Sequence, residues 1–333
     1  MSLSRLAIAL LAVALAVALL PEAAYGWGPG THVFLGSEIL RSLNLVPQAV
    51  ASLLAAHPIE FLYGNLAADI SMAKKYAPVG RHCHHWHVAR EIHEAAGSDS
   101  HLQAATIGYL CHLAADVTAH NVFVPRMLLL ASSTRALGHS YWEHRMDSHV
   151  GSGHLTLARR IVTEYDHSRA DALFDQVLSH TLFSFRTNRR IFRGLIRIQD
   201  FQRWHNIFDA VIDNSRWDLE QEEIDGHLSA SFANIIGLLN RDESSEAATQ
   251  DPIGDEALAL SKRLRREILR HELTAAAPEL QRAADEHFTV PNPSNPAWGQ
   301  RGSTSNLAER AIAAGLGDEV REVEASSQSA IAG

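Results

Sequence analysis

The sequence contains little cysteine and no excess of positive charge, and each scarcity excludes a class of protein. Two cysteines among 333 residues cannot build the disulfide framework of a small secreted domain. The formal net charge of −9, from 29 basic and 38 acidic residues, counts against a nucleic-acid partner, because such proteins usually carry a basic face. Beyond Gly26, no apolar run is long enough to span a bilayer.

The segment 1–26 has the pattern of a cleavable export signal. Arg5 provides a positive start, and an unbroken apolar run extends from Leu6 to Leu20. Ala24 and Gly26 place small residues at the −3 and −1 positions of a cleavage site, so cleavage would make Trp27 the new N-terminus. An uncleaved anchor is the alternative, but a spanning helix needs about 20 apolar residues, more than this run provides. We therefore expect an exported protein, either periplasmic or secreted.

Apolar residues recur three and four positions apart from Gly28 to about Phe288, and two-residue alternation is scarce. This pattern predicts an all-α fold, a single multi-helix globule over residues 27–288. The tail at 289–333 is rich in proline, asparagine, glycine and serine, which predicts disorder. Helices are expected near 32–57, from 59, at 86–96, 102–131, 140–150, 170–185, 189–217 and 221–240, then a polar linker at 242–254 and one or two helices at 255–287.

Histidine is unusually abundant, with 20 residues, of which 12 lie between His82 and His154. Within this stretch His112, Asp116 and His120 are spaced i, i+4 and i+8 along an apolar helix, so they fall within about 80° of one another on one face. A buried carboxylate between two histidines is costly unless a cation compensates it, and zinc takes both ligand types. The alternative is a core histidine that is satisfied by a neighbouring acid.

Two further groups lie near this helix in the sequence. His139 and Glu143 have the i, i+4 spacing that lets two side chains reach one ion, and Asp147 extends the same stripe. Residues 82–87 hold four histidines, of which we expect one or two to be ligands because they cannot all point the same way. The alternatives are an ordinary surface ion pair for the first group and incidental histidines in a solvent-exposed loop for the second.

Four single residues complete the candidates. Asp69 and His32 lie apart from the clusters, and each has a structural alternative: a turn or cap residue for the aspartate, and a first-turn polar residue for the histidine. Cys83 and Cys111 each adjoin a proposed ligand histidine, so a disulfide formed after export and two buried free thiols are equally open.

Five pieces of the sequence, taken in order over residues 27–143, resemble the zinc-dependent phospholipase C family. They are Trp27 with Gly30-Thr31-His32, then residues 64–69 (Gly-Asn-Leu-Ala-Ala-Asp), 82–86 (His-Cys-His-His-Trp), His112-x3-Asp116, and 138–143 (Gly-His-Ser-Tyr-Trp-Glu). The resemblance implies an all-α globule with two to three zinc ions at the base of a cleft. It also implies hydrolysis of phospholipid phosphodiester bonds by a metal-activated water at a membrane surface, with no stable protein partner.

The resemblance assigns a role to each candidate residue. Trp27 would bind one zinc through its α-amine and carbonyl oxygen, together with His32, since an α-amine has a pKa near about 8 and a metal readily displaces its proton. Asp116 would bridge that zinc to a second one, and Asp69 would lie beside the bridging water as general base or extra ligand. The other ligands would be His112 with His84, or next in preference His85, for the second zinc, and His120, His139 and Glu143 for the third.

One spacing departs from the commonest family pattern. Three residues separate Asp116 from His120, where many members have five, and the shorter run resembles the catalytic domain of glycosylphosphatidylinositol-specific phospholipase D. This departure leaves the occupancy of the third zinc site and the lipid head group open.

Two other functions stay open on the sequence. The three-zinc single-strand nucleases also begin the mature chain with Trp followed five residues later by His, as Trp27 and His32 do here. They prefer Asp where this chain has Glu143, and the acidic balance disfavours nucleic acid. A non-catalytic, exported zinc- or phosphate-binding protein would need the ligands but no general base, so the presence of Asp69 argues against it.

Overall fold

The computed structural model describes residues 26–71, 77–131, 137–178, 184–199, 219–271 and 276–292. Every regular element in these residues is a helix, and most of the helices pack around one main core, which confirms the all-α prediction. No helix in these ranges is long and apolar enough to cross a membrane. The expected export signal, apart from Gly26, and all but the first residues of the expected tail lie outside the described residues.

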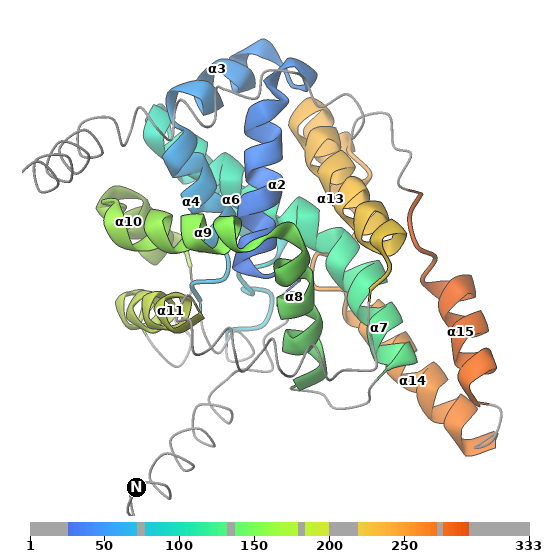
Figure 1. Ribbon diagram of the computed structural model, residues 1–333. Coiled ribbons are helices and arrows are strands. Elements are labelled where there is room, and N and C mark those ends of the chain that lie inside the picture. Colours follow the sequence, from blue (N-terminus) through green and yellow to red (C-terminus); the bar gives the residue numbers. More distant parts are fainter. Residues whose placement is uncertain are drawn as a thin grey trace, which may run out of the picture.

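The order of the helices can be followed in Figure 1, where α2 lies between α4 and α13, and α14 and α15 lie at one edge beside α7. The first half contains α2 (Pro29–Arg41), the 3₁₀ turn η1 (Leu43–Leu45), α3 (Gln48–Ala56), α4 (Pro58–Ala67), α5 (Trp86–Ala95), α6 (Ser100–Thr118), the π-helical turn η3 (Ala119–Phe123) and α7 (Val124–Leu130). The second half contains α8 (Leu137–Val150), α9 (Ser152–Glu164), α10 (Ser168–Val177), α11 (Phe185–Gln199), α13 (Gln221–Arg241), the 3₁₀ turns η4 (Asp242–Ser244) and η5 (Ala247–Thr249), α14 (Asp255–His271) and α15 (Ala276–His287).

The backbones of α4 and α6 are in direct contact because two glycines lie where the helices meet. A Cβ atom on Gly64 would lie 1.9 Å from the carbonyl oxygen of Ala105, and one on Gly108 would lie 2.0 Å from that of Phe61. No side chain fits at such distances, so both positions require glycine. Glu60, near the start of α4, contacts His101 in the first turn of α6, and Asn65, near the end of α4, contacts His112 farther along α6. The two helices therefore run in the same direction. The end of α4 therefore lies beside the last turns of α6.

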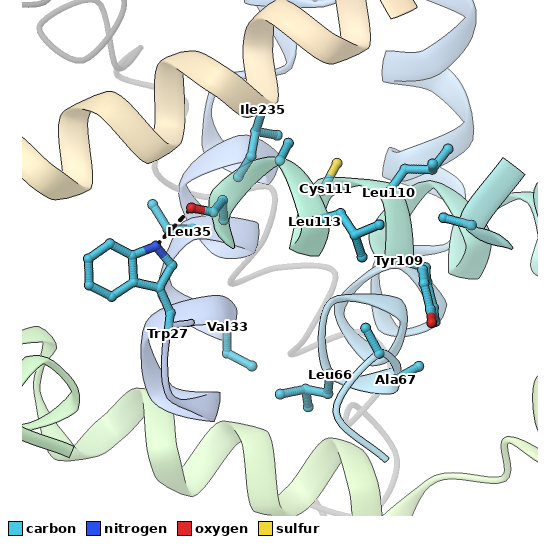
Figure 2. Packing of buried hydrophobic residues seen from close by; sticks show 14 of the residues in the cluster. Trp27, Val33, Leu35, Leu66, Ala67, Tyr109, Leu110, Cys111, Leu113 and Ile235 are labelled. Atoms are coloured by element: carbon cyan, nitrogen blue, oxygen red, sulfur yellow. Dashed lines mark hydrogen bonds between the residues drawn. The ribbon is translucent and has the colours of Figure 1, made fainter. Parts of the chain in front are cut away.

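Trp27 is fully buried and fastens the start of the described chain to the core. Its indole N–H points at the carbonyl oxygen of Ala115 at 3.1 Å and at Ser231 Oγ at 3.0 Å, and the first contact is drawn in Figure 2. Its ring packs with its centroid 4.9 Å from that of Phe123. Because a buried indole N–H needs a polar partner, these contacts fix the ring. The backbone of Trp27 is thereby held between α6 and α13.

The helix expected at 32–57 is divided into α2 and α3. Val46 is extended, with φ −120° and ψ 161°, because Pro47 disfavours the helical conformation of the residue before it. A third helix, α4, follows directly, with Pro58 at its first position, where a missing N–H is tolerated. His57 is consequently placed at the junction between α3 and α4.

The helix expected at 102–131 is interrupted by the π-helical turn at Ala119–Phe123. Pro125 follows this turn, and a proline lacks the N–H and clashes with the carbonyl four residues earlier, here that of Asn121. A local π turn relieves both problems by widening the helix. His120 lies inside the turn, so the angle that separates it from the preceding residues is not that of a regular α-helix.

The polar stretch at 242–254, expected as a linker, packs against the helical core. The backbone carbonyls of residues 250–252 accept hydrogen bonds from Trp86 Nε1 at 2.9 Å, Asn121 Nδ2 at 2.8 Å and His120 Nδ1 at 2.5 Å. Polar composition predicted a linker, but backbone acceptors do not depend on side-chain polarity. The stretch is therefore part of the globule.

His227 on α13 is a buried histidine whose two ring nitrogens have no hydrogen-bond partner among the residues that the structure describes. Burial, and secondly the charge of Arg126, lower the pKa of His227 to about 3. The ring packs edge-on against Phe123, with centroids 5.1 Å apart. A neutral, unsatisfied imidazole in such a place costs stability.

We predict that His227→Leu becomes progressively more stable than the wild type as the pH falls. In the wild type, the unfolded chain takes up a proton on this histidine near pH 6.5, whereas the folded chain does so only near pH 3, so acid favours unfolding. The difference in free energy of unfolding should grow by about 1.4 kcal/mol between about pH 7.5 and about pH 5.5. Urea unfolding at both pH values measures it, with His287→Leu on the exposed side of α15 as control. A difference that does not change with pH would contradict the assignment.

Candidate metal centre

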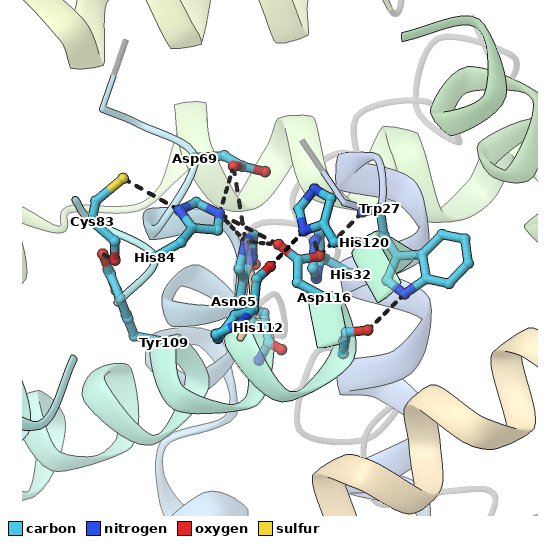
Figure 3. Close-up of polar contacts among 12 residues, drawn as sticks. Trp27, His32, Asn65, Asp69, Cys83, His84, Tyr109, His112, Asp116 and His120 are labelled. Atoms are coloured by element: carbon cyan, nitrogen blue, oxygen red, sulfur yellow. Dashed lines mark hydrogen bonds and ion pairs between the residues drawn. The ribbon is translucent and has the colours of Figure 1, made fainter. Parts of the chain in front are cut away.

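Nitrogen and oxygen ligands from several elements meet at one buried point, shown in Figure 3. The elements are the start of the described chain, α2, the segment after α4, the loop before α5, and α6. None of the residues involved is more than 5% exposed. The residues are Trp27, His32, Asp69, His84, His112 and Asp116.

Asp116 lies at the middle of this cluster, and its two oxygens face different partners. Oδ1 lies 3.2 Å from the backbone nitrogen of Trp27 and 3.3 Å from His32 Nε2. Oδ2 lies 3.3 Å from His84 Nε2 and 3.2 Å from His112 Nε2. A carboxylate arranged in this way can bind one ion with each oxygen.

Asp69 adds a second carboxylate to the same histidines. Its Oδ1 lies 3.4 Å from His84 Nε2 and 3.8 Å from His112 Nε2. The residue directly follows α4, and the glycine contact between α4 and α6 is what brings it to the cluster. Asp69 is therefore held beside the centre by the fold, although it lies far from the other candidates in the sequence.

The histidines are oriented by contacts on the side away from the cluster. His112 Nδ1 donates to the carbonyl oxygen of Asn65 at 2.7 Å, and this contact directs Nε2 at Asp116. His84 Nδ1 lies 3.3 Å from Cys83 Sγ. The rings of His32 and His112 stack, with centroids 3.7 Å apart. Asn65 was not among the predicted residues, because a backbone acceptor leaves no signature in residue type.

The electrostatics favour a neutral His32 beside an ionised Asp116. Burial, and secondly the charge of His112, lower the pKa of His32 to about 4. Burial raises the pKa of Asp116, but its electrostatic and hydrogen-bonding interactions with His112 and His32 outweigh burial and hold that pKa well below its usual range. These are the protonation states that a metal ion requires of its ligands.

The arrangement of these groups fits zinc. His84 Nε2 and His112 Nε2 face each other at 3.2 Å, and no ring nitrogen of His32 makes a hydrogen bond to a described residue. Ligand atoms bound to a tetrahedral zinc at about 2.0–2.1 Å lie about 3.3 Å apart. The contacts to Asp116 are 3.2–3.3 Å long. Imidazole nitrogen with carboxylate oxygen is, moreover, a donor set that zinc prefers over magnesium.

Two of the three residues expected at a third zinc, His120 and Glu143, have described side chains. His120 and Glu143 are both buried, but neither belongs to a metal-binding group formed by described residues. His120 Nδ1 is occupied by the carbonyl oxygen of Pro252. The side chain of His139 lies outside the described part of the chain. The third site thus remains a prediction.

The structure also distinguishes the neighbours of the cluster. The histidine of the 82–87 segment that reaches Asp116 is His84, whereas His85 is half-exposed and immediately precedes α5.

Cys83 and Cys111 are both buried free thiols, and burial raises the pKa of the Cys111 thiol. Of the two states left open by the sequence, the structure contains the reduced one.

Asp147, which lies on α8 with His139 and Glu143, binds the start of α2. It accepts hydrogen bonds from Gly30 N at 3.0 Å, and from Thr31 N and Oγ1, both at 2.7 Å. Burial raises the pKa of Asp147 to about 6, against the effect of these hydrogen bonds. A carboxylate at a helix N-terminus satisfies otherwise free N–H groups. Asp147 thereby positions the first turn of α2, which carries His32.

We predict that Asp116→Asn loses about half or more of the bound zinc, because the amide carries no charge and its nitrogen cannot serve as a ligand. Elemental analysis of the purified protein measures this loss. Asp171→Asn is the matched control, since Asp171 is a buried carboxylate paired with Tyr63 and Arg189, away from the cluster. Retention of the full wild-type zinc content by Asp116→Asn would show that this carboxylate does not bridge two ions.

Comparison with known proteins agrees with this chemistry. A family model described as zinc-dependent phospholipase C matches residues 31–218, which is more than half of the chain and includes every side chain of the cluster except that of Trp27. Searches of curated proteins and of solved structures gave no match. The family description names zinc and phospholipase C, and the buried histidines and carboxylates are groups that could hold a metal ion. The chain belongs to the zinc-dependent phospholipase C family.

Proposed function

We propose that this chain hydrolyses the phosphodiester bond of phospholipids at a membrane surface, as a phospholipase C. The observation that carries the proposal is the position of Asp116, whose oxygens face two separate sets of donors, with Asp69 against the same histidines. Two metal ions joined by one carboxylate suit a phosphodiester, because together they can offset charge on the attacking and leaving oxygens.

The chain offers two metal positions on this proposal. The Trp27 amine and His32 would serve the Oδ1 side of Asp116, and His84 and His112 would serve the Oδ2 side. Zinc bound there would supply the Lewis acidity that activates a water and neutralises phosphate charge. A third position would use the remaining predicted ligands, His120, His139 and Glu143.

Asp69 is proposed as the general base. Its Oδ1 lies within 3.4–3.8 Å of the two histidine nitrogens that face Oδ2 of Asp116, so a water beside those nitrogens is within its reach. Asp69 is 5% exposed, whereas Asp116 is fully buried, which leaves Asp69 nearer to an incoming substrate. Its carboxylate would accept the proton of the attacking water. The products would be diacylglycerol and a phosphorylated head group.

The proposal includes cleavage after Gly26 during export. In the intact chain the Trp27 amide donates to Asp116 Oδ1 at 3.2 Å, and an amide nitrogen has no lone pair to give to a metal. A Cβ on Gly26 would lie 2.0 Å from the same oxygen, so residue 26 fills the space beside the carboxylate. Cleavage would empty that space and create an amine ligand in the same step.

We predict that Asp69→Asn keeps its zinc but loses about 10²- to 10⁴-fold of the activity on phospholipid vesicles, because an amide cannot accept the proton. Zinc content and release of phosphorylated head group are measured on the same preparation. Single-stranded nucleic acid is the control substrate, and the wild type should leave it intact. Full activity of the variant would exclude Asp69 as the base, and preferential cleavage of nucleic acid by the wild type would overturn the lipid assignment.

We further predict that the exported protein begins at Trp27 and contains two or three zinc ions. Intact mass gives the first residue, and elemental analysis of the same sample gives the zinc count. A form that retains Gly26 should contain less zinc, because the amine ligand is missing. An exported chain that keeps residues before Trp27 and still holds its full zinc content would remove the amino terminus from the site.

A further inference from the structure

A second group of metal-binding side chains lies outside the buried centre. His57, Glu60 and His101 each offer a ligand atom within 4.8 Å of the others. His101 Nδ1 lies 2.6 Å from Glu60 Oε1, and the rings of His57 and His101 have centroids 4.1 Å apart. No sequence motif indicates this group, because His101 is remote from the other two residues along the chain.

This group is separated from the buried centre along the two helices that touch. His57 and Glu60 lie at the start of α4, and His101 lies in the first turn of α6. Asp69 follows the other end of α4, and the ten residues of this helix correspond to roughly 15 Å. The peripheral group therefore lies at the first turns of α4 and α6, whereas the buried centre lies toward the opposite ends of these two helices.

The group is also open to solvent. The side chains of His101 and Glu60 are 49% and 29% exposed, and His57 is half-buried. The ligand atoms of the three residues lie up to 4.8 Å apart, whereas two ligands of one zinc lie roughly 3.3 Å apart. Partly exposed side chains can change rotamer and so bring these atoms closer together. Solvent can fill the remaining position.

We infer that His57, Glu60 and His101 form a peripheral zinc site, separate from the proposed catalytic centre and independent of the proposed function. Two imidazoles and one carboxylate with an open position are a ligand set that zinc accepts. The positive N-terminal ends of α4 and α6 disfavour a cation there, so the negative charge of Glu60 is needed to offset them. For the same reason this site binds zinc less tightly than the buried centre. Bound zinc ties the α3–α4 junction to the start of α6.

Titration calorimetry tests the inference on the full-length protein. The buried centre is first loaded with zinc, and the excess is removed by desalting. Zinc chloride added to this protein should bind as one further equivalent, and it should raise the melting temperature through preferential binding to the folded state. His101→Ala should abolish the further equivalent, and the near-isosteric Glu60→Gln should weaken it about 10-fold or more, as expected from loss of the charge.

His287→Ala, which removes a solitary exposed histidine on α15, is the matched control and should bind zinc as the wild type does. Zinc retained from the loading step should be equal in all variants, because the buried ligands are unchanged. Absence of a further equivalent in the wild type would overturn the inference. So would a further equivalent that persists unchanged in both His101→Ala and Glu60→Gln.

Discussion

The buried centre depends on the backbone contact between α4 and α6. Because Gly64 and Gly108 let the two helices touch, the carbonyl oxygen of Asn65 comes within 2.7 Å of His112 Nδ1. The same contact places Asp69 near the other ring nitrogen of His112, Nε2. A methyl group at either glycine would separate the helices by far more than the roughly 0.5 Å that a metal ligand tolerates. A contact without any functional group therefore sets the distances on which the chemistry relies.

Within that frame, charge determines what the centre can bind. Asp116 is fully buried, its pKa is held well below the usual range, and the pKa of His32 is lowered to about 4. A buried carboxylate without a counter-charge costs several kcal/mol. A divalent cation would offset this cost, so metal binding and folding stability are coupled here. The same coupling explains why so many polar groups can be placed in an otherwise apolar core.

The spacing of residues along the sequence predicted those features that depend only on the geometry of a single helix. His112 and Asp116 share a face of α6 as expected, because a spacing of four residues is enough to place them. His120 could not be placed by the same rule, since the π turn before Pro125 changes its angle and a carbonyl 132 residues away holds its ring. The partners of Asp147 could not be predicted, because the N–H groups that it binds lie 116 and 117 residues away. Long-range partners of this kind leave no periodic trace in a single sequence.

The anchoring of Trp27 has a consequence for the order of assembly. Its indole nitrogen contacts Ser231 across 204 residues of chain, so a nascent polypeptide cannot complete this contact until α13 has been synthesised. Until then the bond after Gly26 has no complete binding pocket to protect it. The proposed processing would therefore have a kinetic window, which would close when α13 packs against Trp27. Processing before closure would deliver a free amine to the centre at the moment the centre forms.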